Sequence, residues 1–540
     1  MSHWHLKILV FVSFFWSSEL LAQAGVTILH FPKNMQLLPR NLETNKGIYI
    51  ITGDLHRSST ISTLRLLIQR GDSIFFEKIV PINYNQDTYH FEFPIAIKAE
   101  LIDYQISLYG KKDNNYILMR RAEKVVAGDV ILVNGQSNCI GSIEPEDEHP
   151  FLRSYTAQFG WNRIDYTQPG KWPPHLARNL IEDQKVPVAL FNEAMGGVVQ
   201  NVFLKNFGGG TLNNYHDVLR RLEAAEVKNN LHALIWWQGE SDGWETSTAD
   251  YKRQFKELYA DWKRDFSTAR ILMFQIRYRS CTHTQPNIME AERQLSEEIN
   301  DLDIMSTNNA QSDGCHFTYH NGYDSLGRRM YRLMAARLYK QPITNRTAPN
   351  VDKIWFSNRN EITIQLKNVT GNLQSIGAPW KDFFCQGGNV EITDSKVSGN
   401  QVKLTFSGDS TGVKTLSYLS HVDRRNDWIV NEMSVGILSF HQVSISHEKP
   451  IVPPMDSVTY AVSPSYGNHI FKITIPDSDK KRMVHVYNAL GVLVFEQTWQ
   501  KGDNQEPSFD ATNWQKGMYF VCLEVENKRK KTFKILKTDF

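Results

Sequence analysis

A chain of 540 residues is too long for one ordinary domain, and its length suggests roughly three or four. Hydrophobic residues make up 41% of the sequence and charged residues 22%, which allows packed cores and excludes a wholly disordered protein. The formal net charge of +2 gives no basic field of the kind that attracts nucleic acid, so we expect no nucleic-acid partner.

The first 24 residues differ from the rest of the chain. Lys7 precedes the apolar run "ILVFVSFFW", and Ala22 and Ala24 fill the two small positions of an A-x-A cleavage site. This pattern predicts a secretory signal peptide at 1–24. A membrane anchor is the alternative, although the apolar run is short for a span. No later stretch has about 18 uninterrupted apolar residues, so we expect a mature chain without a transmembrane segment.

Residues 25–126 consist of short alternating runs separated by turn residues, which predicts an N-terminal β-sandwich domain. The runs are "GVTILHF", "GIYIITG", "STLRLLIQR", "SIFFEKIV", "TYHFEFPI" and "YQISLYG".

Residues 127–342 change to buried-type strands that alternate with helical stretches. The strands are "DVILVNG", "VPVALFN", "HALIWWQG" and "RILMFQIR", and the clearest helical stretch is "TADYKRQFKELYADWKRDF". This alternation predicts an α/β domain with a central parallel sheet. In such domains the active residues gather at the carboxyl ends of the strands.

The β pattern returns in the last third of the sequence. We expect a β-sandwich domain at 348–447, a Pro-rich joint "HEKPIVPPMDS", and a C-terminal β-sandwich domain at 458–540 that ends in the basic stretch "KRKKTFKILK".

Ser137 in "ILVNGQSNCI" follows the first strand of the α/β domain, at a strand-to-helix turn. A serine there can present its hydroxyl at the sheet edge, and its own backbone N–H can point at a developing oxyanion. The turn is not the G-x-S-x-G elbow of many hydrolases, because Gly135 lies two residues before the serine and position 139 is Cys. A plain turn is the alternative.

A base candidate lies near the other end of this domain. Asp313 and His316 are three residues apart, a spacing that lets a carboxylate orient an imidazole on a tight turn. A D-x-x-H match is weak evidence by itself. Asp87 and His90 form a second one, which we discount because it lies in the alternating pattern of the N-terminal domain.

Oxyanion donors are the third requirement of acyl transfer. Gly196 and Gly197 follow the strand "VALF", and Gln238 follows the strand in "HALIWWQG". Glu240 and Asp242 allow two interpretations: a carboxylate pair for glycoside hydrolysis, or, as we favour, one carboxylate that supports Gln238 and a neighbouring loop.

These four blocks, "NGQSN", "MGGVVQNVF", "WWQGESD" and "DGCHFTYHNGY", resemble those of the SGNH-hydrolase superfamily, and more narrowly the sialate O-acetylesterase and acetyl-xylan esterase group of carbohydrate esterases. The resemblance implies an SGNH-type three-layer domain. It implies Ser137 as nucleophile, His316 as base and Asp313 as the residue that orients the base. It also implies an oxyanion hole made by the Ser137 N–H, a glycine of the 196–197 pair and Gln238.

The chain departs from the family pattern at two places. Cys139 stands where Met is usual after the Asn, and Val198 and Phe203 occupy the region where the family has Ser or Thr and later Trp. These departures bear on the substrate and not on the assignment of the nucleophile. We expect Gln136, Asn138 and Glu240 to support the site.

The expected substrate is an acetylated carbohydrate, such as sialate or xylan. Four arginines are candidates for contact with a sialate carboxylate, although any surface arginine is more often solvated: Arg120, Arg121, Arg163 and Arg277.

The final segment resembles the C-terminal sorting domain of the type IX secretion system, through "VHVYNALGVLVFEQ", "WQKGMYFVCLE" and "KTFKILK". The resemblance implies a type IX secretion partner and a secreted or surface-attached product. The segment starts with "YAVSPSYG" where the family has Tyr-Pro-Asn-Pro, and a third adhesive β-module is the alternative.

The five cysteines match no zinc spacing, and we expect neither a metal nor an organic cofactor. Pairings that involve Cys139, Cys315 or Cys281 remain open. Two functions follow: an exported serine esterase that deacetylates sugars, or a surface carbohydrate-binding protein on an inactive esterase scaffold. The presence of every residue that the chemistry needs favours the esterase.

Overall fold

The computed structural model describes residues 25–141, 144, 147–164, 169–208, 213–243, 246–279, 286–446, 461–463, 466–467, 470–474, 481–500, 508–525 and 529–538. It divides into two compact units, 1–448 and 449–540. The predicted signal peptide and the Pro-rich joint lie outside the described residues.

The N-terminal strands pair mainly antiparallel. β3 pairs with β1, β2 and β6, β4 pairs with β5 and β7, and β7 pairs with β8. Every run expected in this region forms a strand, whereas β2 was missed because Pro39, which lacks an N–H, lies within it. The strands are β1 (Val26–His30), β2 (Leu37–Asn41), β3 (Lys46–His56), β4 (Thr63–Arg70), β5 (Ser73–Pro81), β6 (Thr88–Lys98), β7 (Tyr104–Lys112) and β8 (Asn115–Gly135).

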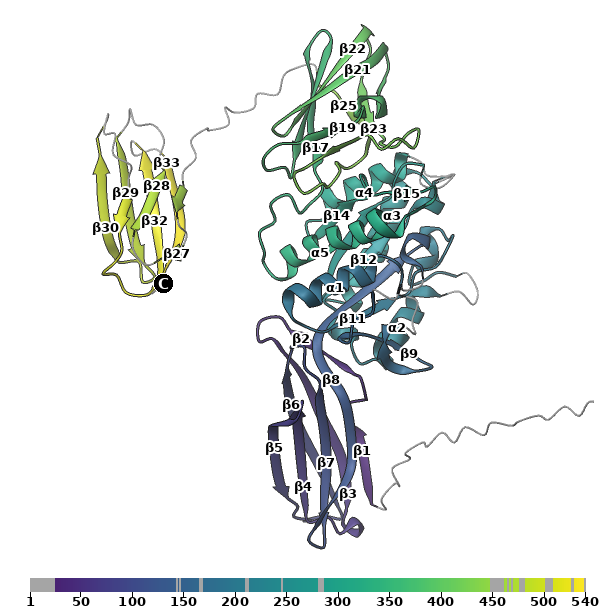
Figure 1. Ribbon diagram of the computed structural model, residues 1–540, viewed down its shortest axis with the longest axis vertical. Helices are drawn as coiled ribbons and strands as arrows, with labels where there is room; N and C mark the ends of the chain where they lie inside the picture. Colours follow the sequence, from purple (N-terminus) through teal and green to yellow (C-terminus); the bar gives the residue numbers. More distant parts are fainter. Residues whose placement is uncertain are drawn as a thin grey trace, which may run out of the picture. The chain divides into compact units, whose positions relative to one another are not determined.

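β8 belongs to two parts of the sheet. Its first half pairs antiparallel with β7, and its second half is the first strand of the central parallel sheet. Figure 1 shows it running from the N-terminal strands into the central region. The predicted boundary between residues 126 and 127 lies inside this strand.

The central sheet has the order β10-β9-β11-β8-β12-β13-β14, in which only the edge strand β10 is antiparallel. Its strands after β8 are β9 (Leu152–Thr156), β10 (Gly160–Arg163), β11 (Val188–Asn192), β12 (Ala233–Trp237), β13 (Arg270–Gln275) and β14 (Leu302–Ser306). Every residue of β12 and β14 is buried, as expected for a sheet covered on both faces.

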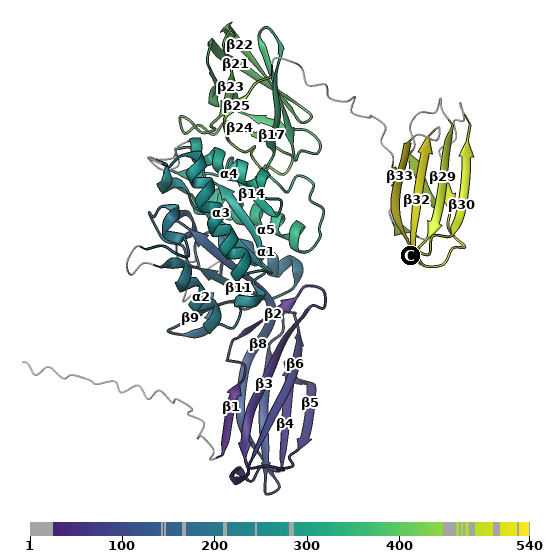
Figure 2. The ribbon, with the colours of Figure 1, turned by 180° about the vertical axis from the view of Figure 1, so that it is seen from behind.

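Five α-helices accompany this sheet among the described residues: α1 (Pro173–Gln184), α2 (Asn214–Ala224), α3 (Thr248–Asp265), α4 (Pro286–Glu298) and α5 (Asp324–Leu338). α1 lies against α5, and α3 lies against α4 (Figure 2). The predicted helix corresponds to α3, which begins where Ser247 Oγ accepts the Asp250 N–H (3.0 Å) and which buries Tyr251, Phe255 and Trp262.

The strand order places a topological switch point at the end of β8. The chain passes from β8 to β11 on one side and later to β12 on the other. Crossover connections then diverge at the carboxyl ends of β8 and β12, and such a switch point is where ligands bind in open α/β sheets.

The segment that follows the central sheet, residues 350–446, is built of short antiparallel sheets, and we call it the β-module. Its sheets are β17-β18-β22-β21, β20-β23-β25 and β19-β24, and they enclose a second core. The strands are β17 (Asn350–Asn358), β18 (Glu361–Lys367), β19 (Gln374–Ile376), β20 (Phe383–Gln386), β21 (Asn389–Ser398), β22 (Gln401–Asp409), β23 (Thr415–Tyr418), β24 (Trp428–Val430) and β25 (Phe440–Ser444).

The second unit has its own core, which includes Phe471, Val484 and Trp499. Its sheets are β26-β28-β31 and β27-β33-β32-β29-β30. The strands are β26 (Ala461–Ser463), β27 (Tyr466–Gly467), β28 (Ile470–Thr474), β29 (Arg482–Asn488), β30 (Leu493–Trp499), β31 (Ser508–Asp510), β32 (Gly517–Val525) and β33 (Arg529–Lys537).

Candidate active site

The nucleophile turn, residues 135–140, follows β8 directly. Gly135 has φ +141°, and a Cβ atom here would lie 2.0 Å from the Trp237 carbonyl oxygen, so only glycine lets β8 and β12 approach this closely. The backbone N–H of Gln136 donates to the same oxygen (2.9 Å), and the 3-10 helix η2 (Ser137–Cys139) begins at the next residue. Ser137 is half-buried at the carboxyl edge of the sheet, beside the switch point.

Two buried side chains tie the nucleophile turn to neighbouring loops. Nδ2 of Asn138 donates to Oε1 of Glu240 (2.7 Å), and Oδ1 of Asn138 accepts the Tyr323 hydroxyl (2.9 Å). Oε1 of Gln136 accepts the backbone N–H of Gly239 (3.2 Å). The first and third sequence blocks are therefore in direct contact. The hydrogen bonds of Gln136 and Asn138 fix the nucleophile turn on its buried side.

The candidate base lies on a two-stranded hairpin, which we call the acid–base hairpin. It consists of β15 (Ser312–Asp313) and β16 (His316–Phe317), and Asp313 is paired directly with His316. Residues of β16 and η2 have Cα atoms within 8 Å of each other. The structure thus brings the two distant sequence blocks to one edge of the sheet.

The side-chain hydrogen bonds of a triad are not formed in this conformation. Among the described residues, the imidazole ring of His316 makes no hydrogen bond to the side chain of Asp313 or of Ser137. Asp313 is exposed and His316 is half-buried, so both side chains have room to reorient. Catalytic hydrogen bonds are often long or misaligned without substrate and shorten when substrate binds.

The glycine loop, residues 193–200, lies beside the nucleophile turn. The Met195 amide donates to the Gly135 carbonyl oxygen (2.9 Å), and a Cβ on Gly196 would lie 3.5 Å from a methyl carbon of Ile140. Gly197 adopts φ +70° and is exposed. Within the part of the chain that the structure describes, the backbone N–H groups of Ser137, Gly196 and Gly197 have no hydrogen-bond acceptor.

Gln238 is fully buried, and its amide group is already engaged. Nε2 donates to the carbonyl oxygen of Val198 (3.2 Å) and to the carboxylate of Asp242. The Tyr251 hydroxyl donates to the backbone carbonyl oxygen of Gln238 (2.7 Å) and lies 3.4 Å from its side-chain Oε1. An oxyanion contact by Gln238, as the sequence predicted, would require one of the two Nε2 bonds to break when substrate binds.

Asp242 joins Gln238 to the glycine loop, since the same carboxylate also accepts the Gln200 backbone N–H (3.0 Å). Asp242 and Glu240 both point into protein, and a glycosidase pair must instead face the sugar from both sides. The contacts agree with the supporting role that we favoured for one of these carboxylates.

Burial controls the charge behind the nucleophile turn. It raises the pKa of Glu240 to about 7 and that of Asp242 to about 6, against the lowering effect of hydrogen bonds from Asn138 and Gln238. It also raises the pKa of Glu292 on α4 well above its usual range. Near neutral pH these shifts favour the protonated form of Glu292 and leave Glu240 partly protonated, which limits the negative charge next to the nucleophile turn.

The four candidate arginines lie in different surroundings. Arg120 and Arg121 are on the half of β8 that pairs with β7, far along the strand from Ser137. Arg277 is buried and donates to the carbonyl oxygens of Thr307 and Ala310.

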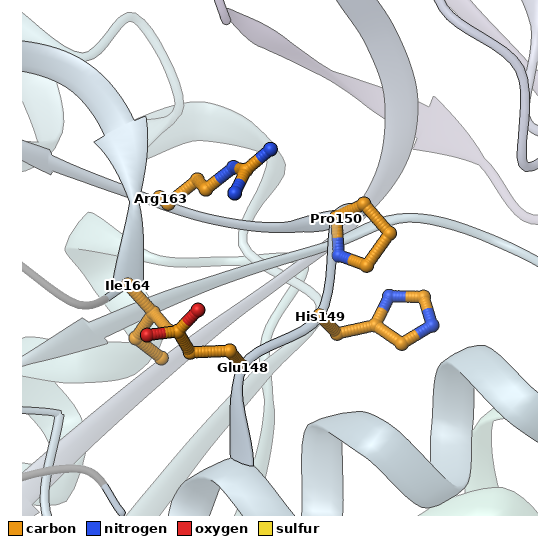
Figure 3. A pocket seen from close by; sticks show the side chains of 5 residues that line it. All are labelled: Glu148, His149, Pro150, Arg163 and Ile164. Carbon is orange, nitrogen blue, oxygen red and sulfur yellow. The ribbon is translucent and has the colours of Figure 1, made fainter. Parts of the chain in front are cut away.

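Arg163 lines a pocket together with Glu148, His149, Pro150 and Ile164 (Figure 3). The first three lining residues precede β9, Arg163 is the last residue of the antiparallel β10, and Ile164 follows it. The pocket therefore lies toward the amino ends of the parallel strands. This pocket is on the opposite edge of the sheet from Ser137.

Sequence reasoning missed a second carboxylate–imidazole pair. Asp147 is fully buried, lies 3.5 Å from Nδ1 of His175 on α1, and accepts the Tyr319 hydroxyl (2.6 Å). No sequence pattern joins these three positions. The discounted His90 contacts Asp54 on the neighbouring strand (2.9 Å).

One of the disulfide pairings that the sequence left open is excluded. Cys139 is buried and has a free thiol, and the half-buried Cys385 and Cys522 are also free. Cys315 is disulfide-bonded. A Cys139–Cys315 bridge is therefore absent, and Cys281 lies outside the described residues.

Comparison with known families gives two matches. Residues 149–336 match the model of the carbohydrate esterases described as sialic acid-specific acetylesterases, a stretch that begins after Ser137 and contains the other three blocks. The resemblance to this esterase family is confirmed. Residues 463–538 match the secretion system C-terminal sorting domain, which confirms that prediction and indicates export from the cell.

Solved structures with a similar fold include a carbohydrate acetylesterase from Xanthomonas citri, which is 15% identical, with a TM-score of 0.55 over 77% of this chain and 99% of that chain. Two further structures are more distant. One is a protein from Arabidopsis thaliana, with 16% identity and a TM-score of 0.33 over 39% of this chain and 99% of that chain. The other is a family two carbohydrate esterase from Clostridium thermocellum, with 10% identity and a TM-score of 0.28 over 55% of this chain and 96% of that chain. The match to the Xanthomonas citri structure shows a carbohydrate-esterase-like fold. No curated protein matches the sequence.

The described residues contain no group of three or more His, Cys, Asp or Glu side chains that could hold a metal ion. They also contain no helix long and apolar enough to cross a membrane.

Proposed function

We propose that this chain is an exported serine esterase that removes O-acetyl groups from carbohydrates, with a triad of Ser137, His316 and Asp313. The supporting observation is the position of the nucleophile turn at the switch point of the sheet, with the acid–base hairpin beside it. The family match supports the carbohydrate esterase class.

The same proposal includes an SGNH-type three-layer domain at 127–342. The strand order β11-β8-β12-β13-β14 and the separate helix pairs α1–α5 and α3–α4 support it. We also propose β-sandwich domains at 25–126, 348–447 and 458–540, with a signal peptide at 1–24 and a secreted or surface-attached product.

In the proposed mechanism His316 takes the hydroxyl proton of Ser137, and Oγ attacks the acetyl carbonyl carbon. The oxyanion is bound by the backbone N–H groups of Ser137 and of Gly196 or Gly197, with Gln238 as a further donor if its amide is released. His316 then protonates the departing sugar alkoxide, and a water molecule repeats the cycle to free acetate and Ser137.

The deciding experiment measures acetate released from acetylated xylan and from acetylated sialic acid. Ser137→Ala should abolish release without lowering the melting temperature, whereas Ser73→Ala, an exposed serine on β5, should release acetate like the wild type. His316→Gln should be inactive, whereas His90→Gln, in the other D-x-x-H match, should be fully active.

Wild-type turnover by the Ser137→Ala variant would disprove the proposed nucleophile. Glycan binding by a wild-type chain that releases no acetate from any ester would favour the inactive-scaffold alternative.

A further inference from the structure

Four stacked side chains connect the acid–base hairpin to the β-module. The Arg277 guanidinium carbon lies 4.4 Å from the ring centre of Phe317 and 5.1 Å from that of Trp428 on β24. The Trp428 ring stacks on His421, with centres 5.6 Å apart and planes 13° apart. We call Phe317, Arg277, Trp428 and His421 the hairpin stack.

The hairpin stack contacts both strands of the hairpin. Phe317 directly follows His316, at one end of the stack. At the other end, Nε2 of His421 lies 3.4 Å from Oγ of Ser312, which directly precedes Asp313. The stack therefore starts on the strand of the candidate base and returns to the strand of the orienting carboxylate.

The hydrogen bonds of His421 fix its tautomer. Nδ1 lies 2.7 Å from the Arg425 carbonyl oxygen, which can only accept, so Nδ1 carries the proton and Nε2 accepts the Ser312 hydroxyl. Burial, followed by the charge of Arg277, lowers the pKa of His421 to about 4. The ring is neutral at the pH values at which a serine esterase works, so this hydrogen bond persists.

Arg277 has an unusual environment for a cation. It is 1% exposed, and among the described residues no carboxylate pairs with it, while Nε and Nη1 have no hydrogen-bond partner. Its Nη2 donates to the carbonyl oxygens of Thr307 and Ala310, and the two aromatic faces add to this compensation. A cation–π contact is worth about 2 kcal/mol or more when it is desolvated. Loss of one face would leave a poorly compensated buried charge directly behind Phe317.

The β-module segment that carries His421 is held in a costly backbone conformation. Ser420 and His421 are consecutive non-glycine residues with φ of 57° and 54°. Left-handed backbone costs roughly 1–2 kcal/mol per residue. Such conformations persist when surrounding contacts fix them, and the Ser420 hydroxyl donates to Asn308 Oδ1 (2.9 Å) in the loop after β14.

We propose that Trp428 and His421 are positioning residues of the esterase, and that the β-module is a structural part of its catalytic unit through the hairpin stack. The inference rests on the proposed function of Asp313 and His316. It assigns Trp428 a role other than sugar binding, because the side chain is 3% exposed and packs against Arg277 and His421, so it cannot stack on a sugar.

The test compares three variants of the full-length protein. Trp428→Ala removes the centre of the stack, Trp428→Phe keeps an aromatic face, and Phe406→Leu weakens the β-module core without touching the stack. For each variant we would measure the melting temperature, kcat and KM for acetate release, and deuterium uptake by peptides that contain residues 312–317.

We expect Trp428→Ala to lower kcat roughly 10- to 100-fold with KM within about twofold, because the base is misplaced while substrate binding is kept. Deuterium uptake at 312–317 should rise. Trp428→Phe should recover most of kcat, and Phe406→Leu should lower the melting temperature while kcat and uptake at 312–317 stay at the wild-type level.

Unchanged uptake at 312–317 in a folded Trp428→Ala protein would overturn the inference, as would an equal loss of kcat in Phe406→Leu. The uptake measurement needs no enzymatic activity. A wild-type protein that releases no acetate would therefore disprove the proposed function while the positioning of the hairpin is still tested.

Discussion

Glu240 shows how one buried carboxyl can link the stability of the site to pH. Its Oε1 accepts a hydrogen bond from Asn138, next to the candidate nucleophile, and burial raises its pKa to about 7. In the unfolded chain a glutamic acid ionises near pH 4.3. Between these two values the unfolded state releases a proton that the folded state keeps, so the folded state loses stability as the pH rises.

Glu240→Gln should remove this pH dependence, because the amide oxygen can still accept from Asn138 and the side chain no longer ionises. We expect the variant to gain stability relative to the wild type as the pH rises from 5 to 8, by at most about 1.4 kcal/mol per pH unit. Urea unfolding at pH 5, 6, 7 and 8 measures the difference. A difference that stays constant over this range would show that Glu240 titrates normally.

Gln238 should matter for both stability and rate, because its amide group connects Asp242 and Val198. Gln238→Ala leaves the Asp242 carboxylate without one donor, so we expect a loss of about 1–3 kcal/mol in the free energy of unfolding. If the amide also serves the oxyanion, kcat should fall roughly 10²- to 10³-fold.

Gln69→Ala is the matched control for this substitution. It removes a side-chain hydrogen bond between Gln69 and Gln105 in the N-terminal sheet, and it should leave kcat unchanged. A Gln238→Ala protein with wild-type kcat would restrict Gln238 to a structural role.

At the scale of elements, the contact between β8 and β12 sets the place of the nucleophile turn. Gly135→Ala would put a methyl group 2.0 Å from the Trp237 carbonyl oxygen, so the two strands would have to separate. We expect the free energy of unfolding to fall by several kcal/mol, which is enough to lower the yield of soluble protein sharply. Gly71 also has a positive φ (+53°), but nothing lies within 4 Å of its missing Cβ.

Gly71→Ala should therefore lower the free energy of unfolding by only about 1–2 kcal/mol, because the left-handed backbone conformation is unfavourable for alanine. The melting temperatures of the two variants measure this difference. Equal losses would mean that backbone conformation, rather than the close approach of the strands, explains the requirement for glycine at position 135.

The elements that the sequence revealed are those with strong local patterns. The run "TADYKRQFKELYADWKRDF" places apolar residues on one helical face, and α3 buries that face. β2 was missed because Pro39 breaks the strand pattern, although tertiary pairing with β8 holds it as a strand. Tertiary contacts here override a local preference.

The candidate site was only partly predictable for the same reason. Ser137, Asp313 and His316 lie in short blocks whose residue types predict acyl-transfer chemistry. The partners of the Gln238 amide and the Asp147–His175 contact depend on side-chain packing between distant segments, for which the sequence has no local signal.

At the scale of the whole molecule, the two units have separate cores, so the second unit should be dispensable for catalysis. A protein containing residues 25–446 should unfold at the same temperature as the main transition of the chain 25–540, and its kcat should agree within about twofold. Differential scanning calorimetry and the acetate assay measure both. A large loss of kcat on truncation would show that the sorting domain contributes to the active site.

The continuity of β8 has a consequence for protein engineering. Side chains alternate along a strand, so inserting or deleting one residue near position 126 would turn all later side chains of β8 to the opposite face. A chimera that exchanges the N-terminal domain must therefore preserve the phase of this alternation across the junction. A donor domain can be fused without repacking the core around β8 only if the side-chain alternation of its last strand continues in register into the second half of β8.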